Sequence, residues 1–118
     1  MINIYSSSRY KLNKKPLTTY AQGLLKTYHV GDSSVLNIAF VGKRKMKQVA
    51  HSYKNEDVAL PVLSFSYLKD PLLETENVIG EVVICYPQAV LLAAQRQKTV
   101  EHMMKELIKH GLENIFLK

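Results

Sequence analysis

The sequence has a single cysteine, no glycine-rich phosphate loop and no long apolar run. Because Cys85 stands alone, neither an intramolecular disulfide nor a zinc site built from several cysteines can form. A bilayer-spanning helix needs about 20 apolar residues, and residues 1–5 lack the charged and apolar regions of a signal peptide. We therefore expect a cytoplasmic protein without a membrane partner.

Acidic residues are also scarce relative to basic ones. The chain carries 16 Lys and Arg against 10 Asp and Glu, a formal net charge of +6. Clustered cations release counterions from phosphates, so a polyanionic partner such as nucleic acid is worth considering. The length of 118 residues and the apolar fraction of 47% predict one globular domain, residues 1–118, with a single core.

Hydrophobic spacing predicts four strands and four helices. The expected strands are residues 1–5, 34–42, 60–67 and 78–85, and the expected helices are residues 16–28, 43–53, 86–96 and 99–112. The first strand should lie at a sheet edge and the second at its centre. The last two should pair antiparallel across a long loop, residues 68–77. This β-α-β-α-β-β-α-α order predicts an α+β fold in two layers, a mixed four-stranded sheet packed with helices.

Basic residues crowd the beginning of the second predicted helix. Lys43, Arg44, Lys45 and Lys47 lie within its first five positions. The helix dipole favours acidic side chains there, so this placement is unfavourable for the helix itself. Two interpretations stay open: a solvated helix start, or a surface that contacts phosphates.

A polar row runs along the last predicted helix. His102, Glu106, His110 and Asn114 follow at four-residue intervals and so share one face. Two histidines one turn apart can hold one metal ion, but Asn114 occupies the position after His110. The residues therefore give an incomplete metal site at His110, with Glu106 as a possible second ligand. A partly solvated polar face is the alternative.

Several segments, taken in order, resemble the YbeY family of bacterial rRNA maturation factors. They are residues 36–42, Tyr53-Lys54, residues 62–65, residues 79–85 with Pro87, and His110-Gly111-Leu112. The resemblance implies a small single-domain endoribonuclease that acts in small-subunit rRNA 3′-end processing. It also implies a zinc ion held by three histidines of an H-G-x-x-H-x-x-x-x-x-H motif.

The motif residues of the family are only partly present. The first His falls on His110 and its Gly on Gly111, but the second His falls on Asn114. The third would fall two residues past Lys118. The family's catalytic Arg falls on Lys54, which keeps the charge for a phosphate contact but loses bidentate geometry.

The resemblance and these departures together predict an rRNA maturation factor that binds small-subunit rRNA or the small ribosomal subunit. The predicted RNA-binding residues are Lys43, Arg44, Lys45, Lys47 and Lys54. Zinc is expected for the family but should be absent or weakly bound here. Two other functions stay open. One is a metal-dependent single-strand endoribonuclease with a site completed by Glu106 or a partner chain, and the other is a protein-interaction module that binds no RNA.

Overall fold

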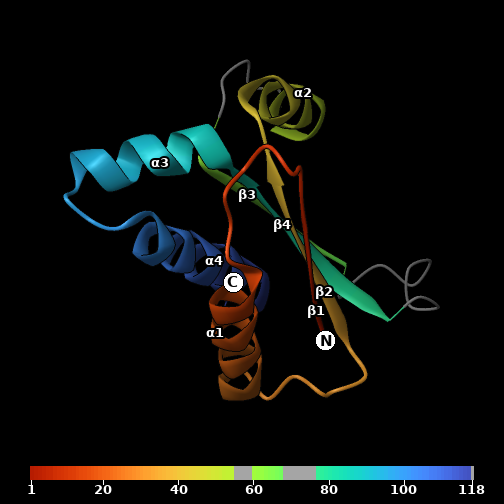
Figure 1. The fold of residues 1–118 in the computed structure, drawn as a ribbon. Helices are drawn as coiled ribbons and strands as arrows, with labels where there is room; N and C mark the ends of the chain where they lie inside the picture. The colour runs from red at the N-terminus through yellow and green to blue at the C-terminus, as the bar shows by residue number, and fades with distance from the viewer. Residues whose placement is uncertain (55–59, 68–76, 118) are drawn as a thin grey trace.

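The computed structural model describes residues 1–54, 60–67 and 77–117. Within them lie four strands and four helices (Figure 1). In chain order they are β1 (Ile2–Ser6), α1 (Lys14–Thr27), β2 (Val35–Val41), α2 (Lys43–Lys54), β3 (Val62–Ser66), β4 (Val78–Cys85), α3 (Tyr86–Gln95) and α4 (Val100–Phe116). The predicted order and the α+β class are confirmed. In this described part, no helix is both long and apolar enough to cross a membrane.

The four strands form one mixed sheet in the order β1-β2-β4-β3. β2 runs parallel to both β1 and β4, and β3 runs antiparallel to β4. Ile38 in the middle of β2 is paired with Ile4 on one side and with Val82 on the other. The predicted edge strand, central strand and antiparallel pair are therefore confirmed. The expected loop between β3 and β4 lies outside the described residues, except for Asn77.

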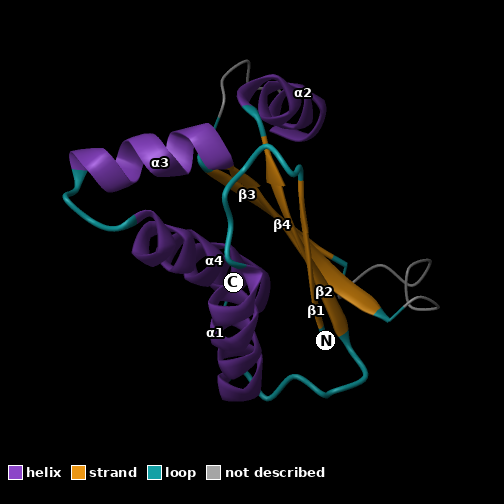
Figure 2. Ribbon diagram, in the orientation of Figure 1, coloured by secondary structure: helices purple, strands orange, loops and turns teal. Residues whose placement is uncertain are grey.

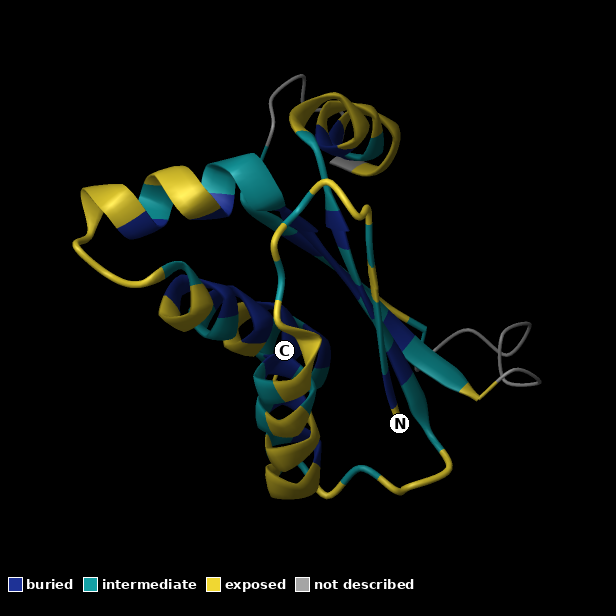
Figure 3. Ribbon diagram, in the orientation of Figure 1, coloured by how far each residue is buried: buried dark blue, intermediate teal, exposed yellow. Residues whose placement is uncertain are grey.

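One face of the sheet is covered by α1, α3 and α4 (Figure 2). Leu36, Ile38 and Phe40 point from β2 into the main core. Val82 and Ile84 of β4 join them, since alternate residues of a strand share one face. Figure 3 shows the buried positions gathered along these strands and on the facing sides of the helices. Removal of this apolar surface from water is the main source of stability.

The opposite face of the sheet is partly covered by α2. Met46 and Ala50 of this helix pack against Leu63, Val83 and Cys85. β4 is therefore buried on both faces, as its unbroken apolar run from residue 82 to residue 85 favours. The element order predicts two layers, a sheet and a layer of helices. In the structure, α2 lies on the other face of the sheet in addition to these layers. Cys85 is buried in this second cluster, and burial raises the pKa of its thiol.

The last helix, α4, begins one residue after Thr99, the predicted start, and extends four residues past the predicted end at residue 112. The Thr99 side chain accepts a hydrogen bond of 3.1 Å from the backbone N–H of His102, which makes Thr99 the N-cap of α4. The helix then continues through Gly111 to Phe116. Gly111 is tolerated inside the helix because it lies directly against β4. A Cβ atom added there would be 2.7 Å from Cγ1 of Val82.

Replacing Gly111 with alanine is expected to destabilise the protein by about 1–3 kcal/mol. The added methyl group would collide with the stiff, buried Val82 side chain, and overpacking costs more than the helix gains from alanine. Chemical denaturation measures the change in the free energy of unfolding. Gly23→Ala in α1 is the matched control, because nothing lies within 4 Å of its added Cβ. That variant should be more stable by about 0.5–1 kcal/mol, and equal effects at the two glycines would contradict the packing described here.

Candidate functional site

The first turn of α2 consists of cations. The backbone carbonyl of Gly42 accepts a 3.0 Å hydrogen bond from the N–H of Met46, so Gly42 is the N-cap. Lys43, Arg44 and Lys45 follow as the first three helical residues, and the first turn contains no acidic residue. Because Met46 packs into the core, the basic side chains on the other sides of the helix remain exposed.

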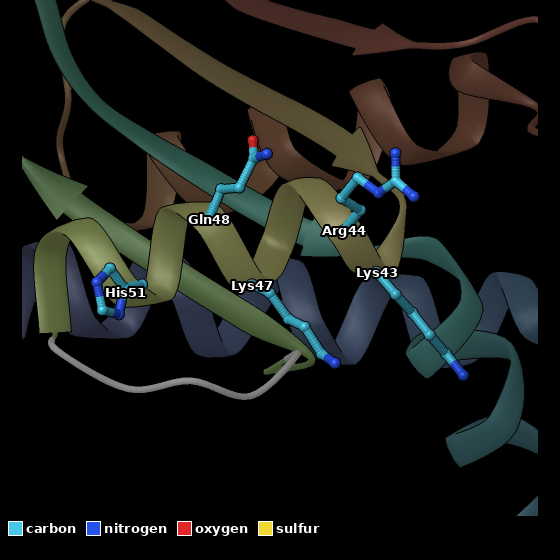
Figure 4. A pocket seen from close by; sticks show the side chains of 5 residues that line it. All are labelled: Lys43, Arg44, Lys47, Gln48 and His51. Carbon is cyan, nitrogen blue, oxygen red and sulfur yellow. The ribbon is translucent and has the colours of Figure 1, made fainter.

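A hollow of about 470 Å³ lies along the exposed side of α2. Its lining residues belong to two adjacent rows of the helix and are Lys43, Arg44, Lys47, Gln48 and His51. Figure 4 shows Lys43 and Lys47 extending to one side of α2, and Arg44 and Gln48 to the other. Three of these five described residues are Lys or Arg and none is acidic, a composition that favours anions.

A second hollow, of about 540 Å³, lies at the start of α2. It shares Lys43, Arg44 and Gln48 with the first and adds Lys45 and Gly42. Its remaining lining residues are Arg9, Tyr10 and Pro87. Arg9 and Tyr10 come from the segment between β1 and α1, which the sequence shows only as a polar, basic loop. Four of the five predicted RNA-binding residues thus line one or both of these hollows, and Arg9 lines the second.

Lys54, the predicted phosphate-contacting residue at the position of the family's Arg, is the last residue of α2. Its side chain lies outside the part of the chain that the structure describes. The predicted role of Lys54 therefore stays a prediction.

His110 lies in a separate groove of about 320 Å³ between α3, α4 and the approach to β3. The groove has an apolar floor and a polar rim, and its lining residues are Pro61, Val62, Leu92, Arg96, Met103, Glu106, Leu107 and His110. Arg96 was not predicted as a site residue, because it lies at the end of another helix and only the fold brings it near His110. An imidazole, a guanidinium and a carboxylate thus share one groove.

The Glu106 carboxylate is already bound by two other side chains. Its Oε1 atom accepts a hydrogen bond from Lys98 Nζ and lies 3.1 Å from His102 Nε2. The hydrogen bond from Lys98 is the main cause that lowers the pKa of Glu106. A metal at His110 would have to compete with both partners for this carboxylate.

The described side chains around His110 are a poor set of donors for zinc. Asn114, one turn after His110, offers an amide, which is a poor zinc ligand beside imidazole. Across residues 1–54, 60–67 and 77–117, no group of three or more His, Cys, Asp or Glu side chains is arranged to hold a metal ion. Among the described residues, His110 thus lies beside a carboxylate that Lys98 and His102 already contact.

The sequence of this chain is similar to those of proteins named Endoribonuclease YbeY. The family model for Endoribonuclease YbeY matches residues 3–113. A relative from Dehalococcoides mccartyi named Endoribonuclease YbeY is 32% identical, over 81% of this chain and 63% of its own length. One of the same name from Phytoplasma australiense is 26% identical, over 93% of this chain and 74% of its own length. The chain thus spans less than two thirds of the Dehalococcoides relative.

The fold is also similar to that of a solved protein. The solution structure of a Thermotoga maritima protein matches with a TM-score of 0.62 at 24% identity, over 95% of this chain and 69% of that protein. The family match covers nearly all elements described above, from β1 to α4. The chain therefore belongs to the YbeY family.

Proposed function

We propose that this protein acts in rRNA maturation by binding small-subunit rRNA or the small ribosomal subunit. Lys43, Arg44, Lys45 and Lys47 contact the phosphate backbone. The relatives' name, Endoribonuclease YbeY, supports RNA as the class of ligand. In this proposal the protein binds RNA without zinc-dependent cleavage.

One observation carries the RNA-binding proposal: the cations at the start of α2 lie where they weaken their own helix. Each charge of the wrong sign in a first turn costs about 0.3–1 kcal/mol. Three successive cations occupy this turn, no acid accompanies them, and two hollows flank them. A phosphate backbone bound there would neutralise the repulsion and release counterions.

The weak metal site is the second part of the proposal. His110 supplies one imidazole, Asn114 stands at the position of the family's second histidine, and Lys98 holds the Glu106 carboxylate. One imidazole does not hold zinc at useful affinity without further ligands. The protein is thus expected to bind RNA with or without zinc.

Sedimentation of cell extract tests the proposed function. The protein is expected to comigrate with small ribosomal subunits at low salt and to leave that fraction as salt rises, because phosphate contacts are screened. A variant with Lys43, Arg44, Lys45 and Lys47 changed to glutamine should leave it at lower salt. Failure of the unmodified protein to comigrate would instead favour an interaction module that binds no RNA.

Metal-dependent cleavage of single-stranded RNA is the second candidate function. It is favoured by the relatives' name and by the groove that places Arg96 near His110. There His110 would bind the metal, and Glu106 or a partner chain would complete the site. If this function holds, His110→Ala should abolish cleavage that zinc supports. If the protein binds RNA without cleaving it, as we propose, the unmodified protein with zinc should cleave a labelled single-stranded RNA no faster than His110→Ala does.

A further inference from the structure

We propose that the hollow between the Arg9–Tyr10 segment and the start of α2 binds a nucleotide of single-stranded RNA. The phosphates lie against the cations, and the base stacks on the Tyr10 ring. This site deepens the proposed RNA-binding function and rests on it. It assigns Arg9 and Tyr10, which come from a loop far from α2 in the sequence, to the RNA-binding surface.

The cations of this hollow converge from two separate segments. Arg9 precedes α1, whereas Lys43, Arg44 and Lys45 begin α2, and all four are exposed. The ion pairs of the described residues involve Lys98, His102 and Lys105 with their carboxylate partners, and none involves these four cations. Four cations, with no carboxylate among the described residues that line the hollow, form a site for phosphate oxygens.

Tyr10 gives the hollow an aromatic surface that is held in place. Its ring stacks on that of Tyr86, with centroids 4.4 Å apart and planes 18° from parallel. The Tyr86 hydroxyl also donates a 3.1 Å hydrogen bond to the backbone carbonyl of Lys11. Tyr86, the first residue of α3, therefore fixes the loop at two neighbouring residues, and little ordering is left for a ligand to impose.

Gly42 allows Tyr10 to reach the beginning of α2. A Cβ atom added at Gly42 would lie 2.8 Å from the Tyr10 hydroxyl oxygen, closer than carbon and oxygen can approach. The aromatic ring and the cations thus border one hollow, beside Pro87. Binding sites for single-stranded nucleic acid combine two components: cations along the phosphate backbone and an aromatic ring on which a base stacks. A duplex keeps its base faces stacked, so only its phosphates can use this surface.

Binding of a labelled single-stranded RNA and of a duplex with the same sequence tests the site. Tyr10→Ala should weaken single-strand binding roughly 5- to 150-fold, as expected for the loss of one stacked base. It should weaken duplex binding by no more than Arg9→Ala does, because the Tyr10 ring also holds Arg9 in place. Tyr10→Phe keeps the ring and should bind like the unmodified protein. Arg9→Ala should weaken both RNAs and lower the slope of log affinity against log salt by about 0.7 for the single strand.

Two outcomes would overturn the nucleotide site. If Tyr10→Ala leaves single-strand binding unchanged while Lys43→Glu with Lys45→Glu abolishes it, the site is wrong and the RNA-binding function stands. If the unmodified protein binds neither RNA, both proposals fail. Ultraviolet crosslinking of the unmodified protein to RNA that contains a photoreactive uridine decides the question even if Tyr10→Ala does not fold. Crosslinks are expected on the peptide with Tyr10, and crosslinks confined to α4 would contradict the site.

Discussion

Replacing Lys43 and Lys45 with glutamate is expected to lower the affinity for single-stranded RNA and to raise the stability of the protein. Two attractive interactions with phosphates become two repulsive ones. Removing each attraction costs about 0.7 kcal/mol, and each new repulsion costs about the same again. The expected loss of affinity is on the order of 100-fold at low salt. Acids in the first turn of α2 instead favour the helix by about 0.3–1 kcal/mol each.

This pair of opposite effects separates function from folding. RNA titration measures the affinity, and chemical denaturation measures the free energy of unfolding. A variant that is more stable but binds RNA more weakly cannot owe its defect to unfolding. Equal RNA affinity in the variant and the unmodified protein would show that the first turn of α2 is only a solvated helix start.

The matched control lies in α1, which also begins with two exposed cations. Lys14 and Lys15 open this helix, its first turn has no acid, and neither residue lines the two hollows beside α2. Replacing both with glutamate makes the same change in net charge and the same favourable change in dipole interaction. The control should gain similar stability and keep its RNA affinity within a few fold. If the two double variants lose RNA affinity equally, the change in net charge alone would explain the loss, and the position of the cations in α2 would not matter.

Asn114→His is expected to raise the affinity for zinc by about tenfold or more, because a second imidazole ligand adds at least about 1.4 kcal/mol to binding. His110 and residue 114 lie one turn apart on α4, the spacing at which two imidazoles reach one ion. Competition with a coloured chelator measures the affinity. Lys109→His is the matched control, since neighbouring residues do not share a helix face, and it should change little.

The unmodified protein, washed with chelator, should contain far less than one zinc per chain. About one zinc per chain, with no further gain from Asn114→His, would contradict the weak site. Such a result would mean that Glu106 leaves Lys98 to bind the metal, or that another chain supplies ligands. The metal-dependent endoribonuclease would then become the leading function.

The sheet and its helices could be predicted because their signals are local. The apolar run of β2 marks a central strand, and Thr99 marks the beginning of α4. The spacing of His110 and Asn114 also predicts an incomplete metal site on one helix face, and this stays a prediction. Each of these features depends on neighbours within a few positions of the chain.

The residues that line the hollow at the start of α2 and the groove of His110 could not be predicted in the same way. Arg9 reaches the start of α2 because Tyr10 stacks on Tyr86, a contact between segments that lie far apart in the sequence. Arg96 reaches the groove of His110 because α3 and α4 pack together. Nothing in the local pattern of either arginine indicates its partners. A basic residue beside an aromatic one in a loop was the only available signal for Arg9.

The most direct test of RNA binding by α2 is its salt dependence in the presence of a metal chelator. We expect the unmodified protein to bind single-stranded RNA without metal, with log affinity falling linearly against log salt. Changing Lys43, Arg44, Lys45 and Lys47 to glutamine should lower that slope by about 3, since each phosphate that is no longer neutralised removes about 0.7. An unchanged slope, or binding that appears only with zinc, would contradict RNA binding by α2 without a metal.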